Sequence, residues 1–102
     1  MKERVKNLLK ELISKECSQI TEEKKEGKIL FFCGSYLMGS ITNITEGLTA
    51  VSFYSKSVKD PLIYKFLEKM EKEFGSYIIE KGTKISSGVE DNFYYTYVHL
   101  KA

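Results

Sequence analysis

Several residue types are scarce in this sequence, and the scarcity of histidine, cysteine and arginine argues against particular classes of function. The 102 residues contain no tryptophan, one histidine, one proline and two cysteines. Because His99 is the only histidine, a metal cluster built from several histidines is excluded. Together, His99, Cys17 and Cys33 are one ligand short of a structural zinc site. Arg4 is the only arginine, and planar bidentate recognition of phosphate or guanine is arginine's speciality. We therefore expect no metal and no cofactor.

Long apolar runs are also missing. The first residues, MKERVKNLLKELISKE, are interrupted by charges throughout and so lack the apolar region of a signal peptide. No run approaches the ~20 apolar residues of a membrane span. The net charge of +2 gives no global field to attract nucleic acid. These features predict a cytoplasmic protein with no membrane partner, in which we favour two free thiols at Cys17 and Cys33 over one disulfide.

The best-defined element that the sequence predicts is a helix over 60–75. Asp60 can cap its first turn, and Pro61 occupies the first helical position, where a missing N–H costs nothing. Gly75 is predicted to end the helix in the left-handed conformation. Apolar residues recur at helical spacing between these ends, at Leu62, Ile63, Phe66, Leu67, Met70 and Phe74. A second amphipathic helix is predicted over Lys2 to Glu16.

Strand-like segments follow each helix. They lie at 17–21, 29–33, 41–45, 48–55, 76–80, 84–85 and 93–100. The predicted turns are a charged one at 22–28, Glu46-Gly47, and 81–83, with a loop at 86–92. The two glycines of GSYLMGS, residues 34–40, indicate a bulge or a turn. In strand 48–55, alternation places two sets of side chains on opposite faces: Thr49, Val51 and Phe53 on one, and Ala50, Ser52 and Tyr54 on the other.

The order of helix, strands, helix, strands predicts a single α+β domain over 1–102. We expect both helices to pack on one face of a mostly antiparallel sheet. The same order suggests two helix-plus-antiparallel-strand units, 1–57 and 58–102, related as a pseudo-repeat. An offset of 58 residues aligns the apolar residues Val5 with Ile63 and Leu8 with Phe66, so the repeat is one of pattern and not of residue identity.

No residue pattern indicates catalysis. Gly34 and Gly39 have the glycine spacing of a phosphate-binding loop, but Ser40 stands where that loop needs a lysine. The paired acids Glu22-Glu23 and Glu90-Asp91 fall in predicted turns, where a carboxylate is solvated and its pKa is not raised for acid–base work. We therefore predict that the protein is not an enzyme.

The thirteen phenylalanines and tyrosines, densest at 93–97, predict a binding surface. Tyrosine is common in protein interfaces, and we favour a protein or peptide partner, bound in a groove between the halves or at a sheet edge. The alternative is single-stranded nucleic acid stacked on strand 93–99 with Lys81, Lys84 and Lys101 nearby. The oligomeric state stays open, with a homodimer through a free strand edge as one form. The candidate partner-binding residues are Tyr36, Met38, Tyr54, Tyr95 and Tyr97.

The two helical segments LLKELISKEC (8–17) and FLEKMEKEFG (66–75) carry a resemblance. With the chain length and the Lys/Glu/Ile/Tyr-rich composition, they resemble the short orphan proteins of archaeal viruses, in particular the Acidianus filamentous virus group. The resemblance covers the whole chain and contains no diagnostic motif. It implies an intracellular protein in an infected host with no catalytic residues to carry over, and it agrees with an interaction role, such as a viral adaptor or an inhibitor of a host factor.

Overall fold

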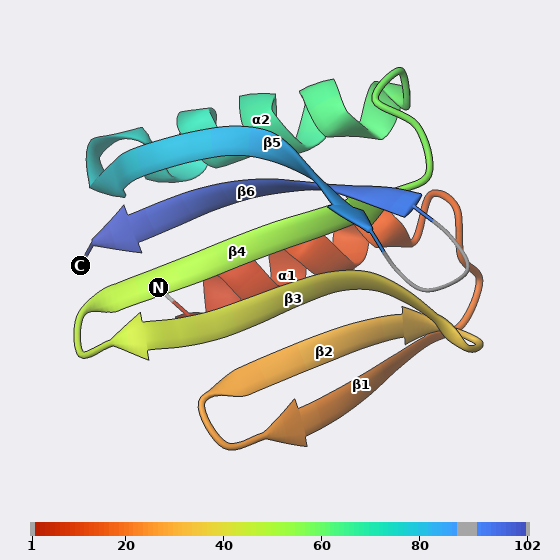
Figure 1. Cartoon of the computed structure of the whole chain (residues 1–102). Coiled ribbons are helices and arrows are strands. Elements are labelled where there is room, and N and C mark those ends of the chain that lie inside the picture. The colour runs from red at the N-terminus through yellow and green to blue at the C-terminus, as the bar shows by residue number, and fades with distance from the viewer. Residues whose placement is uncertain (1, 88–91, 102) are drawn as a thin grey trace.

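The computed structural model describes residues 2–87 and 92–101, which form two α-helices and a six-stranded antiparallel sheet. The expected α+β class is therefore confirmed. The helices are α1 (Lys2–Ile13) and α2 (Pro61–Phe74), and a 3-10 helix, η1 (Gly75–Tyr77), follows α2. The strands are β1 (Ile20–Lys25), β2 (Lys28–Cys33), β3 (Tyr36–Thr45), β4 (Leu48–Ser55), β5 (Ile78–Ser87) and β6 (Asn92–Lys101). Their order in the sheet is β1-β2-β3-β4-β6-β5, so β1 and β5 are the edges (Figure 1).

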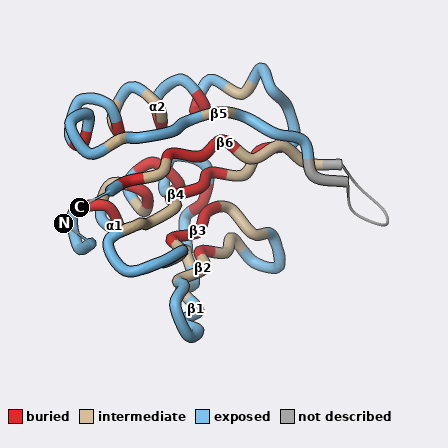
Figure 2. The backbone as a smooth tube through the Cα atoms, turned by 60° about the vertical axis from the view of Figure 1, so that its left-hand side comes forward, coloured by how far each residue is buried: buried red, intermediate tan, exposed pale blue. Residues whose placement is uncertain are grey.

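The hydrophobic core joins both helices to the middle of the sheet. Gly39 of β3 lets α1 approach closely, since a Cβ there would lie 3.0 Å from Ile13 Cδ1 and 3.1 Å from Leu9 Cδ2. Phe66 of α2 stacks on Phe53 of β4 with ring centroids 6.0 Å apart. Buried residues run along β4 and β6, whereas the edge strands are mostly exposed (Figure 2). Within the part of the chain that the structure describes, no helix is long and apolar enough to cross a membrane.

The start of α2 agrees with the sequence, but its end does not. Asp60 Oδ1 accepts a hydrogen bond from the backbone N–H of Leu62 at 2.9 Å, as expected of an N-cap. Gly75 was expected in the left-handed conformation and instead has φ −51° and ψ −40°, which is right-handed helical. The chain therefore continues into η1, and the strand predicted to begin at residue 76 begins at Ile78.

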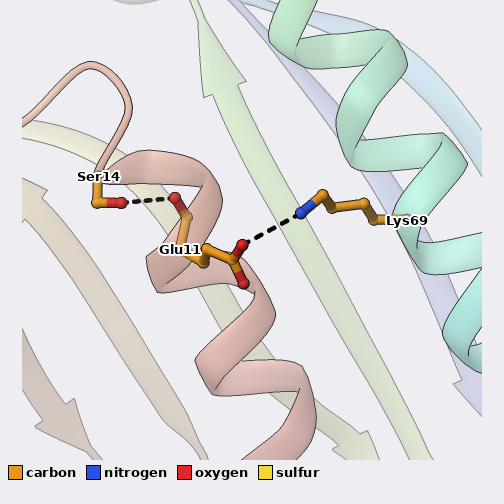
Figure 3. Close-up of polar contacts among 3 residues, drawn as sticks. All are labelled: Glu11, Ser14 and Lys69. Carbon is orange, nitrogen blue, oxygen red and sulfur yellow. Dashed lines mark hydrogen bonds and ion pairs between the residues drawn. The ribbon is translucent and has the colours of Figure 1, made fainter.

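The first helix is shorter than predicted and is joined to the second by ion pairs. It ends at Ile13, and the hydroxyl of Ser14 donates to the carbonyl of Glu11 at 2.6 Å, a local bond that competes with continued helix. Lys69 of α2 donates to the Glu11 carboxylate at 3.4 Å (Figure 3). Arg4 and Glu73 form a second link between the helices at 2.8 Å.

Two predicted turns are strands in the structure. The charged segment 22–28 was expected to be a turn, but β1 occupies Ile20–Lys25 because the side chains of an edge strand can reach water. The turn expected at 81–83 lies inside β5, where Gly82 pairs with Tyr97 of β6. In contrast, β4 has the predicted bounds and faces, and Gly47, with φ 79°, forms the predicted tight turn after β3. Of the loop expected at 86–92, residues 88–91 lie outside the described residues.

Cys17 and Cys33 form a disulfide, so the expectation of two free thiols is wrong. Their Cα atoms are 5.9 Å apart, because β1 runs antiparallel to β2 and places Ile20 opposite Cys33. Disulfides are typical of oxidising compartments and also of intracellular proteins from hyperthermophiles. The cytoplasmic location therefore stays a prediction.

The two-unit pseudo-repeat is not confirmed. Four strands follow α1 along the chain, whereas only two follow α2 in the residues that the structure describes. The units 1–57 and 58–102 therefore differ in composition, and their relation as copies of one element stays a prediction.

Candidate partner-binding site

Three of the five candidate residues line one cavity. Tyr36, Met38 and Tyr54 border a hollow of about 640 Å³, which we call the aromatic cavity. It lies where the β2–β3 turn, the end of β4 and the start of α2 meet. Asp60 and Phe93 from the second predicted half also line it, so the aromatic cavity lies at the seam between residues 1–57 and 58–102.

The β2–β3 hairpin positions Tyr36 and Met38. A two-residue loop, Gly34-Ser35, joins the strands, and Gly34 has the positive φ of 61° that this kind of turn gives to glycine. Phe31 pairs with Gly39 and Phe32 with Leu37, which leaves Met38 as the extra residue of a β-bulge. The segment expected to hold a bulge or a turn therefore contains both.

Tyr36 and Tyr54 are held in different ways. The side chain of Tyr36 is 62% exposed at the rim, and the Lys56 ammonium lies 4.6 Å from its ring centroid, within reach of a cation–π interaction. Tyr54 is half-buried, and its hydroxyl lies 3.1 Å from the Ser40 hydroxyl on the neighbouring strand. Of the two tyrosine rings that line the aromatic cavity, one is therefore accessible and the other is held in place.

Two carboxylates give the aromatic cavity a negative side. Glu16, three residues beyond the end of α1, and Asp60, the cap of α2, both line it. Partial burial raises the pKa of the Glu16 carboxyl above its ordinary value, and the negative charge of Asp60 raises that pKa further. Both causes disfavour the ionised form of Glu16, and a cation bound between the two groups would relieve the second.

Tyr95 and Tyr97 lie outside the aromatic cavity, in a row of rings that we call the ring row and that consists of Tyr54, Tyr95, Tyr97 and His99. Tyr95 pairs with Tyr54, and their ring centroids are 6.2 Å apart. The row continues to Tyr97, 6.1 Å from Tyr95, and then to His99, 5.0 Å from Tyr97. Tyr97 is only 8% exposed, and its hydroxyl donates to Glu80 at 3.2 Å, so it offers a partner little surface.

The lysines expected near the aromatic strand differ in position. The Lys84 ammonium lies 5.6 Å from the centroid of the Tyr97 ring. Lys81 instead bonds Glu71 of α2 and is not available to the ring row. Only part of the cationic group suggested by the sequence therefore accompanies the aromatic residues.

Sequence reasoning missed the charged lining of the aromatic cavity. The sequence indicates Asp60 only as a helix cap and places Glu16 only at the end of a helix. Nothing in the spacing brings residue 16 close to residue 60. The one feature that could have located Glu16 is its neighbour Cys17, since a disulfide to Cys33 places this connection beside the β2–β3 turn.

No family model, curated protein or solved structure matches this chain. In residues 2–87 and 92–101, no group of three or more histidine, cysteine, aspartate or glutamate side chains could hold a metal ion.

Proposed function

We propose that this protein is a non-enzymatic interaction module that binds an extended peptide segment of a partner protein in the aromatic cavity. The observation that supports it is that Tyr36, Met38 and Tyr54, chosen from the sequence as partner-binding residues, border one hollow of about 640 Å³. Tyrosine and methionine are both enriched in protein interfaces, and methionine adapts its shape to different partners. Residues from both 1–57 and 58–102 line the cavity, which supports binding between these two parts of the chain.

Charge complementarity defines the occupant. The aromatic side of the cavity suits an apolar or aromatic side chain, while Glu16 and Asp60 suit a basic one. The Lys56 ammonium lies over the ring of Tyr36. Among the ion pairs of the described residues, none joins Lys56 to Glu16 or Asp60. The peptide we propose therefore carries an aromatic or aliphatic residue close to a lysine or arginine.

The setting we propose is intracellular, as a viral adaptor or an inhibitor of a host factor. The resemblance of the two helical segments to archaeal virus proteins supports this setting. The disulfide between Cys17 and Cys33 is compatible with it, because intracellular proteins of hyperthermophiles retain disulfides.

Selection of peptides from a random display library on the immobilised protein tests this function. We expect selected sequences to combine an aromatic or aliphatic residue with a nearby lysine or arginine. A labelled selected peptide should bind Tyr36→Ala and Met38→Ala about tenfold more weakly than wild type, as expected when interface side chains worth about 1.4 kcal/mol are removed. Glu16→Gln should weaken the binding of the same peptide. It should not weaken the binding of a variant peptide that lacks the basic residue.

The matched control is Tyr64→Ala. Tyr64 lies on α2 with 70% exposure, close to the 62% of Tyr36, and it does not line the aromatic cavity. It should bind the selected peptide like wild type. Equal loss in the Tyr36 and Tyr64 variants, or selected peptides without basic residues, would contradict the proposed site.

A second candidate function is single-stranded nucleic acid binding, which the ring row favours. We infer that both helices lie over one face of the sheet: Gly39 contacts α1, Phe53 contacts α2, and these two residues pair in register and so share a face. Tyr54 and Tyr95 would then lie on the uncovered face. Rings there, with Lys84 beside them, could stack bases.

A gel shift with single-stranded DNA at low and moderate salt tests this alternative. Binding should weaken as salt rises and should be lost in Tyr95→Ser. If no gel shift is seen even at low salt, single-stranded nucleic acid binding is excluded.

The oligomeric state we propose is a homodimer through β5. Of the two edges, β1 carries four consecutive charged residues over 22–25, which discourage pairing. Strand β5 exposes Ile79 by 58% and Ile85 by 55%. Sedimentation of wild type and of the Ile79→Lys variant tests this proposal. A lysine on this edge strand should discourage strand pairing and favour the monomer.

A further inference from the structure

A second hollow lies at the opposite end of β2 from the aromatic cavity. Cys33, the last residue of β2, lines the aromatic cavity, whereas Lys28, its first residue, lines a hollow of about 350 Å³ beside the β1–β2 turn. This turn joins β1 to β2 at one side of the sheet (Figure 1). The first turn of α1, the ends of β1 and β2, and Asn43 of β3 form its wall. We call it the lysine hollow, after its charged lining residues Lys2, Glu3, Lys6, Lys24, Lys25 and Lys28.

The lysine hollow concentrates positive charge. Its lining holds five lysines and one glutamate, an excess of four positive charges, whereas the whole chain has a net charge of +2. The rest of the chain is therefore net negative by two. A clustered charge lined by protein walls focuses the local potential, even where the net charge of the molecule is small.

Acidic neighbours neutralise only part of this charge. Glu22 binds Lys6 at 3.1 Å and also binds Lys10 at 3.0 Å. Glu23 binds Lys25 at 3.3 Å. Among the ion pairs of the described residues, none includes Lys2, Lys24 or Lys28.

The β1–β2 hairpin also places two like charges face to face. Lys25 and Lys28 are direct cross-strand partners, an arrangement that destabilises an antiparallel pair unless something neutralises it. The turn between them is fixed, because the carbonyl of Gly27 accepts a hydrogen bond from the Asn43 N–H at 2.8 Å. An anion in the lysine hollow would offset the repulsion without any movement of the strands.

We propose that the lysine hollow binds an oligophosphate anion, the chemistry shared by free polyphosphate and the nucleic acid backbone. Lysine ammonium groups recognise phosphate as point charges and need no planar, bidentate geometry. The three lysines without an ion pair match the charge of two or three linked phosphates better than that of a single monoanion. This site is separate from the aromatic cavity and does not depend on the peptide-binding function.

Calorimetric titration with sodium tripolyphosphate at low ionic strength tests the proposal. The double variant Lys24→Gln/Lys28→Gln should bind about tenfold more weakly, the effect of losing about 1.4 kcal/mol from two charge contacts. The matched control, Lys59→Gln/Lys65→Gln, removes the same charge at two exposed lysines that do not line the hollow. It should bind like wild type.

Stability separates a lost site from a damaged fold. Since Lys28→Gln removes the repulsion with Lys25, the double variant should be at least as resistant to urea as wild type while it binds more weakly. Equal weakening in both double variants would mean that only net charge matters and would overturn the proposal. So would the absence of tripolyphosphate binding to wild type at low salt.

A short single-stranded oligonucleotide distinguishes the two sources of phosphate. If Lys24→Gln/Lys28→Gln weakens both tripolyphosphate and the oligonucleotide, the lysine hollow takes the nucleic acid backbone. If the variant weakens binding of tripolyphosphate alone, the ligand is a free oligophosphate, and any oligonucleotide binding belongs to the ring row. Both results support an oligophosphate site.

Discussion

The phenol ring of Tyr97 fills the space that a side chain at residue 82 would need. A Cβ on Gly82 would lie 3.0 Å from Tyr97 Oη and 3.3 Å from its Cζ. Tyr97 is buried among its neighbours and bonds Glu80, so its ring has little freedom to move away. A glycine within a strand often marks such a close approach, which here explains why a segment with the composition of a turn forms the middle of β5.

Replacing Gly82 with valine should therefore destabilise the protein, although valine favours strands. We expect a loss of about 1–3 kcal/mol in the free energy of unfolding, the usual cost of overpacking. The displaced phenol should also lose its hydrogen bond to Glu80. Urea unfolding followed by circular dichroism measures the effect, and unchanged stability would contradict the close approach of Tyr97.

Gly75 offers a control with the opposite expected sign. It has right-handed helical angles, and no atom lies within 4 Å of the position of an added Cβ. Gly75→Ala should therefore stabilise the protein by about 0.4–1 kcal/mol through the lower entropy of its unfolded chain. A destabilised Gly75→Ala would indicate the left-handed conformation that the sequence alone suggests.

Elements with a strong local pattern could be predicted, and elements that depend on distant residues could not. The start of α2 follows from Asp60 and Pro61, and β4 follows from its alternation, because each pattern is complete within its own segment. Strand β1 is charged like a turn and forms only because β2 offers it an edge. The disulfide likewise depends on that pairing, which brings Cys17 close to Cys33 although sixteen positions separate them.

The same distinction applies to the candidate site. Tyr36, Met38 and Tyr54 could be chosen from the sequence because tyrosine and methionine are enriched in protein interfaces. The acidic side of the aromatic cavity could not be predicted, since it requires the end of α1 to meet the start of α2. The lysine hollow was hidden by the low net charge, because charges far apart in sequence cancel in the sum and gather in the fold.

The disulfide should contribute strongly to stability. It closes a loop with a sequence separation of 16 between the α1–β1 connection and the end of β2. For a loop of this length the loss of chain entropy in the unfolded state corresponds to about 3 kcal/mol. The double variant Cys17→Ser/Cys33→Ser should lose about this much, and wild type in a strong reductant should match it. Thiol labelling of the unfolded wild type without reductant should find no reactive cysteine, and two reactive thiols would contradict the disulfide.

Glu16 should make stability depend on pH in the direction opposite to an ordinary ion-paired carboxylate. Its pKa is raised in the folded protein above the ordinary value of 4.5, so the folded state binds this proton more tightly than the unfolded state. Its contribution to stability is therefore lost as the pH rises through the raised pKa.

The side chain at residue 16 cannot ionise in the Glu16→Gln variant. We therefore expect this variant to have a higher free energy of unfolding than wild type, and we expect this advantage to be larger at pH 7 than at pH 4. Unfolding of both proteins at the two pH values measures the difference, from which the titration of all other groups cancels. An advantage that does not change with pH would contradict the raised pKa. Addition of a basic peptide that binds the aromatic cavity should reduce the advantage at pH 7, because the bound cation favours ionised Glu16.

Glu22 should show the ordinary direction, because it joins β1 to two lysines of α1. Desolvation raises the pKa of Glu22, but the hydrogen bonds from Lys10 and Lys6 outweigh it, and the pKa is lowered below 4.5 overall. The stabilisation is therefore present above pH 4.5 and is lost as the pH falls through the lowered pKa. Glu22→Gln should lose about 1–2 kcal/mol at pH 7, as expected for charge-assisted hydrogen bonds that are partly shielded from water.

The neighbouring Glu23→Gln is the matched control. Glu23 pairs with Lys25 on the surface, where both side chains are about half exposed, and such pairs contribute only about 0–1 kcal/mol. The stability deficit of Glu22→Gln should shrink as the pH approaches 3, while the stability of Glu23→Gln should stay close to that of wild type.

The Glu22→Gln variant also releases Lys6 into the lysine hollow, so it should bind tripolyphosphate more tightly than wild type. If the Glu22→Gln variant loses stability without this gain in affinity, Lys6 does not contribute to phosphate binding in the lysine hollow.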